Sequence, residues 1–173
     1  MSASSAAPDT RTEEPREIRV KVADYAVASS GTISTIGLGS CVAIVLYDAL
    51  VRVGGLAHVL LPNEAMARDR SNPAKFPATA VPLLLEKMRA LGAVPDRIHA
   101  KVVGGASMFG NLFPPSGINI GERNLAAVRD VLAVAKLPIV AQDTGSDYGR
   151  SVYFFLRDGR VEVRSLRKGS RVL

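Results

Sequence analysis

The sequence predicts a single α/β domain with a mixed, mainly antiparallel sheet and two main helices. Its 173 residues suit one domain, and segments with strand-like patterns outnumber those with helical periodicity. Most connections between these segments are short, as in a compact domain. Residues 1–16, rich in Ser, Ala and Pro, are expected to form a flexible tail. Residues 17–167 are then the folded domain, and residues 168–173 a basic C-terminal tail.

Strand signals dominate the first third of the chain. Apolar and charged residues alternate over 18–22, which predicts a half-buried strand. The charge-free run from Tyr25 to Tyr47 is long enough to cross a bilayer, but Ser, Thr and Gly interrupt it, so two strands joined by a polar turn are expected. Its last part, residues 41–47, is continuously apolar and predicts a strand buried on both faces. Residues 52–61 form a second such run.

The middle of the chain predicts a loop followed by the first helix. Residues 63–77 are charged and contain two prolines, which is typical of either a lid or a plain surface loop. Thr79 suits an N-cap, and apolar residues at helical spacing follow until Gly92 ends the helix. Residues 98–103 then form another buried strand.

The last third predicts a second helix and an antiparallel hairpin. Asn119 and Glu122 form an N-terminal capping pattern, and Pro138 lies beyond the end of the helix. A strand begins at Ile139. Strands at 148–156 and 161–166 are expected to pair around an Asp-Gly turn. The Gly104-Gly105-Ala106 sequence is interpreted as a tight turn, because no nucleotide-binding motif is present.

Composition excludes several classes of protein. One Cys and two His permit neither an internal disulfide nor a Cys-rich zinc site. No metal-ligand spacing is visible, so no metal site is expected. The N-terminal residues lack the apolar stretch of a signal peptide, so a cytoplasmic protein without membrane insertion is expected.

The net charge of +6 is concentrated at the C-terminal end. Seven basic residues there outweigh Asp158 and Glu162. A solvated surface explains this charge most simply, and an acidic protein partner is the next interpretation. Nucleic acid ranks last, because only 5% of residues are aromatic and no recognition motif is visible. The basic residues are Arg150, Arg157, Arg160, Arg164, Arg167, Lys168 and Arg171.

Cys41 and His58 are candidates for a catalytic pair. Cys41 follows a glycine-rich segment directly before a buried strand, and His58 lies inside the next apolar run. If these strands form a hairpin centred near residue 50, Cys41 lies opposite about residue 59 and therefore close to His58. An imidazole there would activate the thiol and protonate a leaving group. A buried structural Cys and a hydrogen-bonded core His remain equally open, and His99 is expected to be structural.

Four motifs carry a family resemblance. The chain resembles the CheD family, the chemoreceptor glutamine deamidases of bacterial and archaeal chemotaxis, from about residue 17 to residue 167. The motifs occur in the order typical of that family. They are Thr35-Ile-Gly-Leu-Gly-Ser-Cys41-Val-Ala, Gly54-Gly-Leu-Ala-His58-Val-Leu-Leu-Pro62, Lys101-Val-Val-Gly-Gly-Ala-Ser-Met-Phe109 and Ile120-Gly-Glu-Arg-Asn124.

The resemblance implies a fold, a site and partners. The fold is an α/β sandwich, and the catalytic set is Cys41, His58 and Thr35, with no cofactor. The substrates are glutamine side chains on the cytoplasmic helices of chemoreceptors, and receptor methylesterase-type activity also occurs in the family. Many members bind the phosphatase CheC, so a non-catalytic adaptor of CheC and receptors is the alternative. The chain departs from the family pattern at Gln142 and Ser146, where an acidic residue and a glycine are expected.

Overall fold

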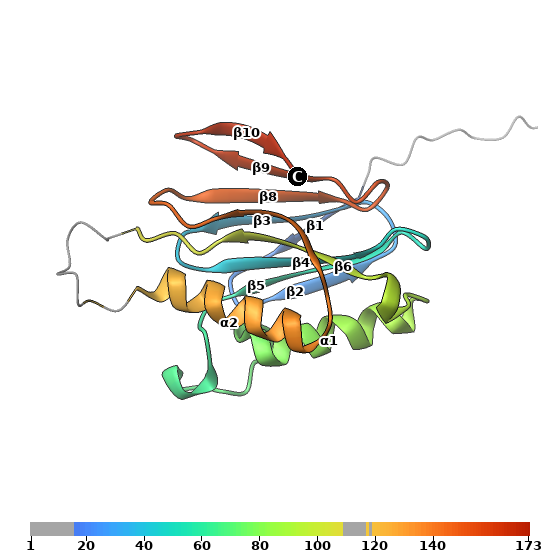
Figure 1. Cartoon of the computed structure of the whole chain (residues 1–173). Helices are drawn as coiled ribbons and strands as arrows, with labels where there is room; N and C mark the ends of the chain where they lie inside the picture. Colours follow the sequence, from blue (N-terminus) through green and yellow to red (C-terminus); the bar gives the residue numbers. More distant parts are fainter. Residues whose placement is uncertain (1–15, 109–116, 118) are drawn as a thin grey trace, which may run out of the picture.

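The computed structural model describes residues 16–108, 117 and 119–173. Most of the tail expected at 1–16 lies outside these residues. The described residues form an α/β domain with two α-helices and two five-stranded sheets (Figure 1). The inner sheet has the strand order β2-β5-β4-β6-β7, and the outer sheet has the order β1-β3-β8-β9-β10. The predicted α/β class is confirmed, but the single sheet expected from the sequence is two stacked sheets.

The elements follow one another with short connections. The strands are β1 (Glu17–Val20), β2 (Tyr25–Ala28), β3 (Thr32–Leu38), β4 (Val42–Asp48), β5 (Val53–Val59), β6 (His99–Gly104), β7 (Ile139–Thr144), β8 (Arg150–Phe155), β9 (Val161–Ser165) and β10 (Gly169–Val172). The α-helices are α1 (Pro77–Ala90) and α2 (Ile120–Val134), and the short 3-10 helices are η1 (Glu64–Met66), η2 (Pro73–Lys75) and η3 (Pro95–Arg97).

Both sheets are mixed and mainly antiparallel, as predicted. Among the described strands, β1 pairs with β3 and β6 pairs with β7 in parallel. The remaining pairings are antiparallel, including the β4–β5 and β8–β9 hairpins. The β4–β5 hairpin places the start of β4 beside the end of β5, which is the arrangement that the candidate site requires.

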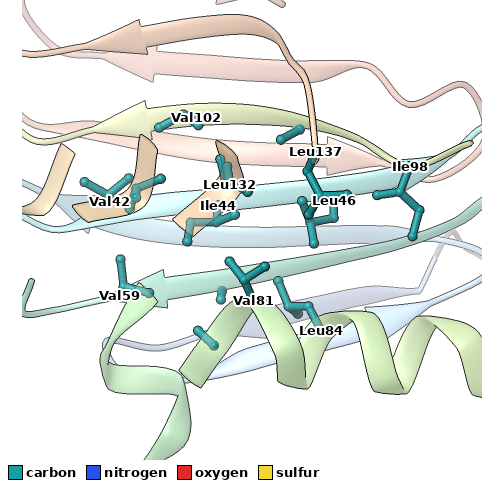
Figure 2. Close-up of a cluster of buried hydrophobic side chains, with 14 of the residues drawn as sticks. Val42, Ile44, Leu46, Val59, Val81, Leu84, Ile98, Val102, Leu132 and Leu137 are labelled. Carbon is teal, nitrogen blue, oxygen red and sulfur yellow. The ribbon is translucent and has the colours of Figure 1, made fainter. Parts of the chain in front are cut away.

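The inner sheet is covered on both faces. The helices α1 and α2 lie against one face, and the outer sheet lies against the other (Figure 1). Figure 2 shows the helix side, where Val42, Ile44 and Leu46 of β4 pack against residues of α1 and α2. The alternate residues Ala43, Val45 and Tyr47 pack between the sheets. Every residue of β4 is buried, which confirms the prediction from its continuous apolar run.

Two local expectations differ from the structure. The run from residue 25 to residue 47 forms three strands: residues 29–31, where Gly31 adopts a positive φ, separate the first two, and residues 39–41 separate the last two. The first helix is capped at Phe76, since Pro77 has the fixed φ that suits the first helical position. Thr79 instead lies inside the first turn, and its hydroxyl donates to the Pro73 carbonyl.

The segments expected as a loop and as a tail are partly regular. Residues 63–77 contain the short helices η1 and η2, and Pro77 begins α1. Residues 169–172, expected within a basic tail, form β10 and pair with β9 at the edge of the outer sheet. Residues 169–172 are therefore part of a sheet and not of a tail.

Candidate active site

The three predicted site residues gather between the two sheets. Thr35 comes from β3 of the outer sheet, and His58 comes from β5 of the inner sheet. Cys41 directly precedes β4. Thr35 and His58 are fully buried, and Cys41 is 8% exposed. Strand pairing within the inner sheet and the stacking of the two sheets thus bring together residues separated by up to 23 positions in the sequence.

The register of the β4–β5 hairpin places Cys41 and His58 on one face. Ala43 lies opposite His58 and Val42 lies opposite Val59. Extending this register by one residue puts Cys41 opposite Leu60. The sequence predicted that Cys41 lies opposite about residue 59, which differs from the structure by one residue. Because side chains alternate along a strand, Cys41 and Ala43 both point toward the outer sheet. Cys41 and His58 are diagonal cross-strand neighbours, a relationship that typically spans about 7–8 Å.

A hydrogen bond between the sheets determines how His58 holds its proton. The Thr35 hydroxyl oxygen lies 2.7 Å from Nδ1 of His58. The same hydroxyl donates its single proton to the Val20 carbonyl, at 2.8 Å. Thr35 must therefore accept the bond from Nδ1–H of His58, which leaves the lone pair on Nε2. Within the described residues, Nε2 is buried and meets no hydrogen-bonding partner.

Burial keeps both reactive groups neutral in the resting protein. It lowers the pKa of His58 from 6.5 to about 4. It also raises the pKa of the Cys41 thiol, and a hydrogen bond from the backbone N–H of Cys41 only partly opposes this effect. The resting pair is thus a thiol and a neutral imidazole, not the ion pair in which an imidazolium lowers the thiol pKa. His58 can accept a proton at Nε2 when the thiol attacks.

Glycines with positive φ shape the backbone on both sides of Cys41. A bulge follows Thr35, since Thr35 pairs with Val152 but Leu38 pairs with Arg150, and Gly37 in the bulge has φ +78°. On the opposite side, Gly104 has φ +113°, and a Cβ there would lie 2.4 Å from the Cys41 carbonyl oxygen. The structure does not show the tight turn predicted at Gly104-Gly105-Ala106: Gly104 ends β6, and the N–H groups of Gly105 and Ala106 donate to the carbonyls of Cys41 and Gly39 in the segment before β4.

Sequence reasoning missed one buried polar residue at this site. Asn124 of α2 donates from Nδ2 to the carbonyl of Ser40, at 2.9 Å, and to the carbonyl of Leu60, at 3.1 Å. Ser40 precedes Cys41, and Leu60 follows His58 by two residues. The available signal was an uncharged polar residue next to Leu125 on the apolar stripe of a predicted helix.

The other candidates identified in the sequence lie outside this cluster. His99, at the start of β6, packs edge-to-face on Tyr47 with ring centroids 5.9 Å apart, and burial lowers its pKa. Arg150 is buried and donates to Asp143, so it does not belong to a basic surface. Arg164 and Arg167 pair with acidic side chains, which reduces the free positive charge of this region.

Over residues 16–108, 117 and 119–173, no group of three His, Cys, Asp or Glu side chains has a metal-binding arrangement. No helix in these ranges combines the length and the apolar character needed to cross a bilayer.

Comparison with known proteins gives closely similar relatives. A protein of Caldanaerobacter subterraneus subsp. tengcongensis named probable chemoreceptor glutamine deamidase CheD is 44% identical over 161 residues, which cover 92% of this chain and 99% of that protein. A protein of the same name from Pyrococcus abyssi is 46% identical over 152 residues, covering 87% of this chain and 93% of that protein. Among solved structures, the hypothetical protein YfiH of Bacillus licheniformis aligns with a TM-score of 0.45 at 13% identity, covering 80% of this chain and 62% of that one. Nothing about function follows from so loose a structural likeness.

A family model described as CheD chemotactic sensory transduction matches residues 60–165. The match begins after His58, so it does not itself include Thr35, Cys41 or His58. It nevertheless covers more than half of the chain, in agreement with the relatives that align over most of its length. The chain therefore belongs to the CheD family.

Proposed function

We propose that this protein is a chemoreceptor glutamine deamidase that converts glutamine side chains on receptor cytoplasmic helices to glutamate. The names of the relatives support the reaction and the substrate class. The single observation that carries the site assignment is the bond from Nδ1–H of His58 to Thr35. This bond leaves a buried lone pair on the face of the inner sheet that also presents the chain's one cysteine.

The first half of the reaction forms a thioester. The Cys41 sulfur attacks the carboxamide carbon, and its proton passes to Nε2 of His58. The carbonyl oxygen gains negative charge, which the backbone N–H of Cys41 stabilises by a hydrogen bond. The tetrahedral intermediate collapses as His58 delivers the proton to the departing nitrogen. Ammonia leaves, and the glutamyl carbonyl remains bonded to sulfur.

The second half releases glutamate. Water attacks the thioester carbon while Nε2 of His58 takes one of its protons. The second tetrahedral intermediate breaks its carbon–sulfur bond, the sulfur regains a proton from His58, and the carboxyl product dissociates. Thr35 holds the imidazole throughout and accepts from Nδ1–H whether His58 is neutral or protonated, so it stabilises the imidazolium between the steps.

A direct assay tests this function. Purified protein is incubated with a chemoreceptor cytoplasmic fragment, and peptides are analysed by mass spectrometry for conversion of Gln to Glu. We expect conversion at specific glutamines by the wild type and none by Cys41→Ala. Absence of conversion by the wild type, or equal conversion by Cys41→Ala, would overturn the proposal. The variant Val134→Ala, at the end of α2, is the control for a neutral substitution, because that side chain is exposed and lies outside the site.

The CheC phosphatase is a second partner that the family resemblance implies. A deamidase that also binds CheC would keep CheC affinity after Cys41→Ala while losing conversion of receptor glutamines. If Cys41→Ala instead retained receptor binding, CheC binding and a normal chemotactic response, the protein would act as an adaptor of CheC and receptors, and the enzyme hypothesis would be wrong. Because the substrate helices are cytoplasmic, the protein would act in the cytoplasm.

Basic side chains on the outer sheet and its edge offer a docking surface for acidic partners. Arg164 and Lys168 are exposed, although Glu162 accepts from Arg164 at 2.8 Å. Arg164→Ala combined with Lys168→Ala would weaken receptor or CheC binding without changing the Cys41 thiol. If both partners bind the double variant as tightly as the wild type, Arg164 and Lys168 contact solvent only and take no part in docking.

A further inference from the structure

Asn124 is a fully buried polar residue in the second turn of α2, within the Ile120–Asn124 motif. Both hydrogens of its carboxamide are used outside the helix, on the carbonyls of Ser40 and Leu60. Its Oδ1 atom is buried without a hydrogen-bonding partner among the described residues. Such an unpartnered oxygen costs about 1–3 kcal/mol, so an apolar residue would suit a purely packed position better.

The two carbonyls that Asn124 holds belong to the two strand ends at the site. In the extended register of the hairpin, Leu60 lies opposite Cys41. Asn124 therefore joins the start of β4 to the end of β5, at the point where the thiol and His58 come together. A helix that otherwise covers the far face of the inner sheet thereby contacts the backbone that carries the nucleophile.

Three consecutive carbonyls at this point are each held by a different donor. The Gly39 carbonyl accepts from the backbone N–H of Ala106, and the Cys41 carbonyl accepts from that of Gly105, both at 2.8 Å. The Ser40 carbonyl, between them, accepts from the Asn124 side chain. Asn124 thus donates to the middle one of three consecutive carbonyls, and the backbone N–H groups of Gly105 and Ala106 donate to the other two.

The Ser40 carbonyl and the Cys41 N–H belong to one planar peptide group. Because the peptide is rigid and trans, a bond that fixes the direction of the carbonyl also fixes the direction of the N–H. In the resting protein this N–H acts to lower the pKa of the thiol of its own residue, against the larger effect of burial. In the reaction proposed above it donates to the developing oxyanion. Its direction therefore affects both the thiol and the tetrahedral intermediate.

We propose that Asn124 is a positioning residue that orients the Ser40–Cys41 peptide so that the Cys41 N–H serves the reacting centre. It also keeps Cys41 across from His58 by holding the Leu60 carbonyl. The catalytic part of this inference rests on the proposed deamidase function. The effect on the thiol does not, since it follows from the backbone geometry alone.

The thiol itself reports on this arrangement, because Cys41 is the only cysteine in the chain. The rate of alkylation by iodoacetamide is measured against pH for the wild type and for Asn124→Ala and Asn124→Leu. The leucine variant fills a similar volume without a donor, which avoids a cavity. Val128→Ala, one turn further along the buried face of α2, is the matched control for loosened helix packing.

We expect both Asn124 variants to move the midpoint of the alkylation profile to higher pH, because a Cys41 N–H that is no longer held in place stabilises the thiolate less. Val128→Ala should keep the wild-type midpoint. With receptor fragment, the Asn124 variants should lose about 100-fold in kcat with little change in KM, as expected when a reacting group is misplaced. Val128→Ala should retain kcat at a temperature where it is folded.

The inference is overturned if either folded Asn124 variant keeps the wild-type midpoint, or if Val128→Ala shifts it equally. A wild type that deamidates no receptor glutamine would overturn the proposed function, and the alkylation profiles would still decide the role of Asn124. If the profiles shift but kcat does not, Asn124 orients the resting thiol only, and its assignment to the reacting centre is wrong.

Discussion

The hydroxyl of Thr35 lies 2.7 Å from Nδ1 of His58 and joins the outer sheet to the inner sheet. Since Thr35 also donates to the Val20 carbonyl of the neighbouring strand β1, its position is fixed from two sides. The imidazole consequently has a defined orientation and a defined tautomer. Threonine is common inside strands, but the position of Thr35 gives it a specific task here, which is to orient the imidazole of His58.

Removing the Thr35 hydroxyl should reduce both activity and stability. Thr35→Val leaves the Nδ1–H of His58 without its acceptor, at a cost of about 1–3 kcal/mol. We expect kcat for glutamine conversion to fall roughly 10- to 100-fold. Thr35→Ser retains the hydroxyl and should remain within a few-fold of the wild type. Wild-type kcat in Thr35→Val would show that the bond does not orient the imidazole.

The buried imidazole should titrate far below the ordinary range. Burial lowers the pKa of His58 to about 4, so the group stays neutral from pH 8 down to about pH 5. The acid limb of kcat/KM should then lie near pH 4 and not near 6.5. NMR titration of the two histidine rings, with His58→Gln to assign them, measures this directly. A His58 ring that titrates at 6.5 or above would contradict the neutral resting pair.

The same pKa shift predicts how stability depends on pH. The unfolded chain binds a proton at His58 near pH 6.5, whereas the folded chain resists it until about pH 4. The neutral form thus favours folding fully above pH 6.5, and this contribution is lost as the pH falls toward 4. Urea midpoints should decline more steeply between pH 6.5 and 4.5 for the wild type than for His58→Gln. If the urea midpoints of the wild type and of His58→Gln decline in parallel, the loss of stability comes from titratable groups other than His58.

A side chain at Gly104 should displace the nucleophile. A Cβ there would lie 2.4 Å from the Cys41 carbonyl oxygen, and the φ of +113° is itself unfavourable for alanine. We expect Gly104→Ala to lower both the melting temperature and kcat. Gly92→Ala is the matched control, because it shares a positive φ but has no atom within 4 Å of the new Cβ. It should lose about 1 kcal/mol of stability and keep wild-type kcat. Equal kcat in the two variants would refute the displacement.

Replacing Ser146 with glycine should stabilise the protein. Ser146 has φ +61°, a left-handed conformation, at the position where the family resemblance leads one to expect glycine. Its carbonyl accepts from the Ser107 N–H at 2.7 Å, so the turn is held in place. We expect Ser146→Gly to add about 0.5–1 kcal/mol to the free energy of unfolding. Ser151→Gly, in the extended strand β8, should instead lower it. A destabilising Ser146→Gly would contradict this account.

Local patterns predicted the elements better than their arrangement. The apolar run at residues 41–47 and the cap at Asn119 correspond to β4 and α2, because burial and capping depend on neighbouring residues. The division into two sheets depends on long-range pairing, such as β3 with β8, which periodicity does not encode. The strand β10 was missed since its four residues are all exposed and show no apolar alternation.

The candidate site was likewise predicted only in part. The predicted hairpin placed Cys41 close to His58 with a register error of one residue, because a single turn determines that register. Thr35 came only from the family resemblance, since it reaches His58 across the gap between the two sheets. Asn124 was not singled out, because its bonds to Ser40 and Leu60 arise only when α2 packs on the inner sheet.

The covalent intermediate provides the most direct test of Cys41 as the nucleophile. Wild-type protein is mixed with a receptor fragment, quenched in acid within a turnover, and analysed by intact-mass and peptide mass spectrometry. The account predicts an adduct with the mass of the substrate less one ammonia, located on the peptide that contains Cys41 and absent from Cys41→Ala. Conversion of glutamine by Cys41→Ala, or an adduct on any other residue, would contradict it.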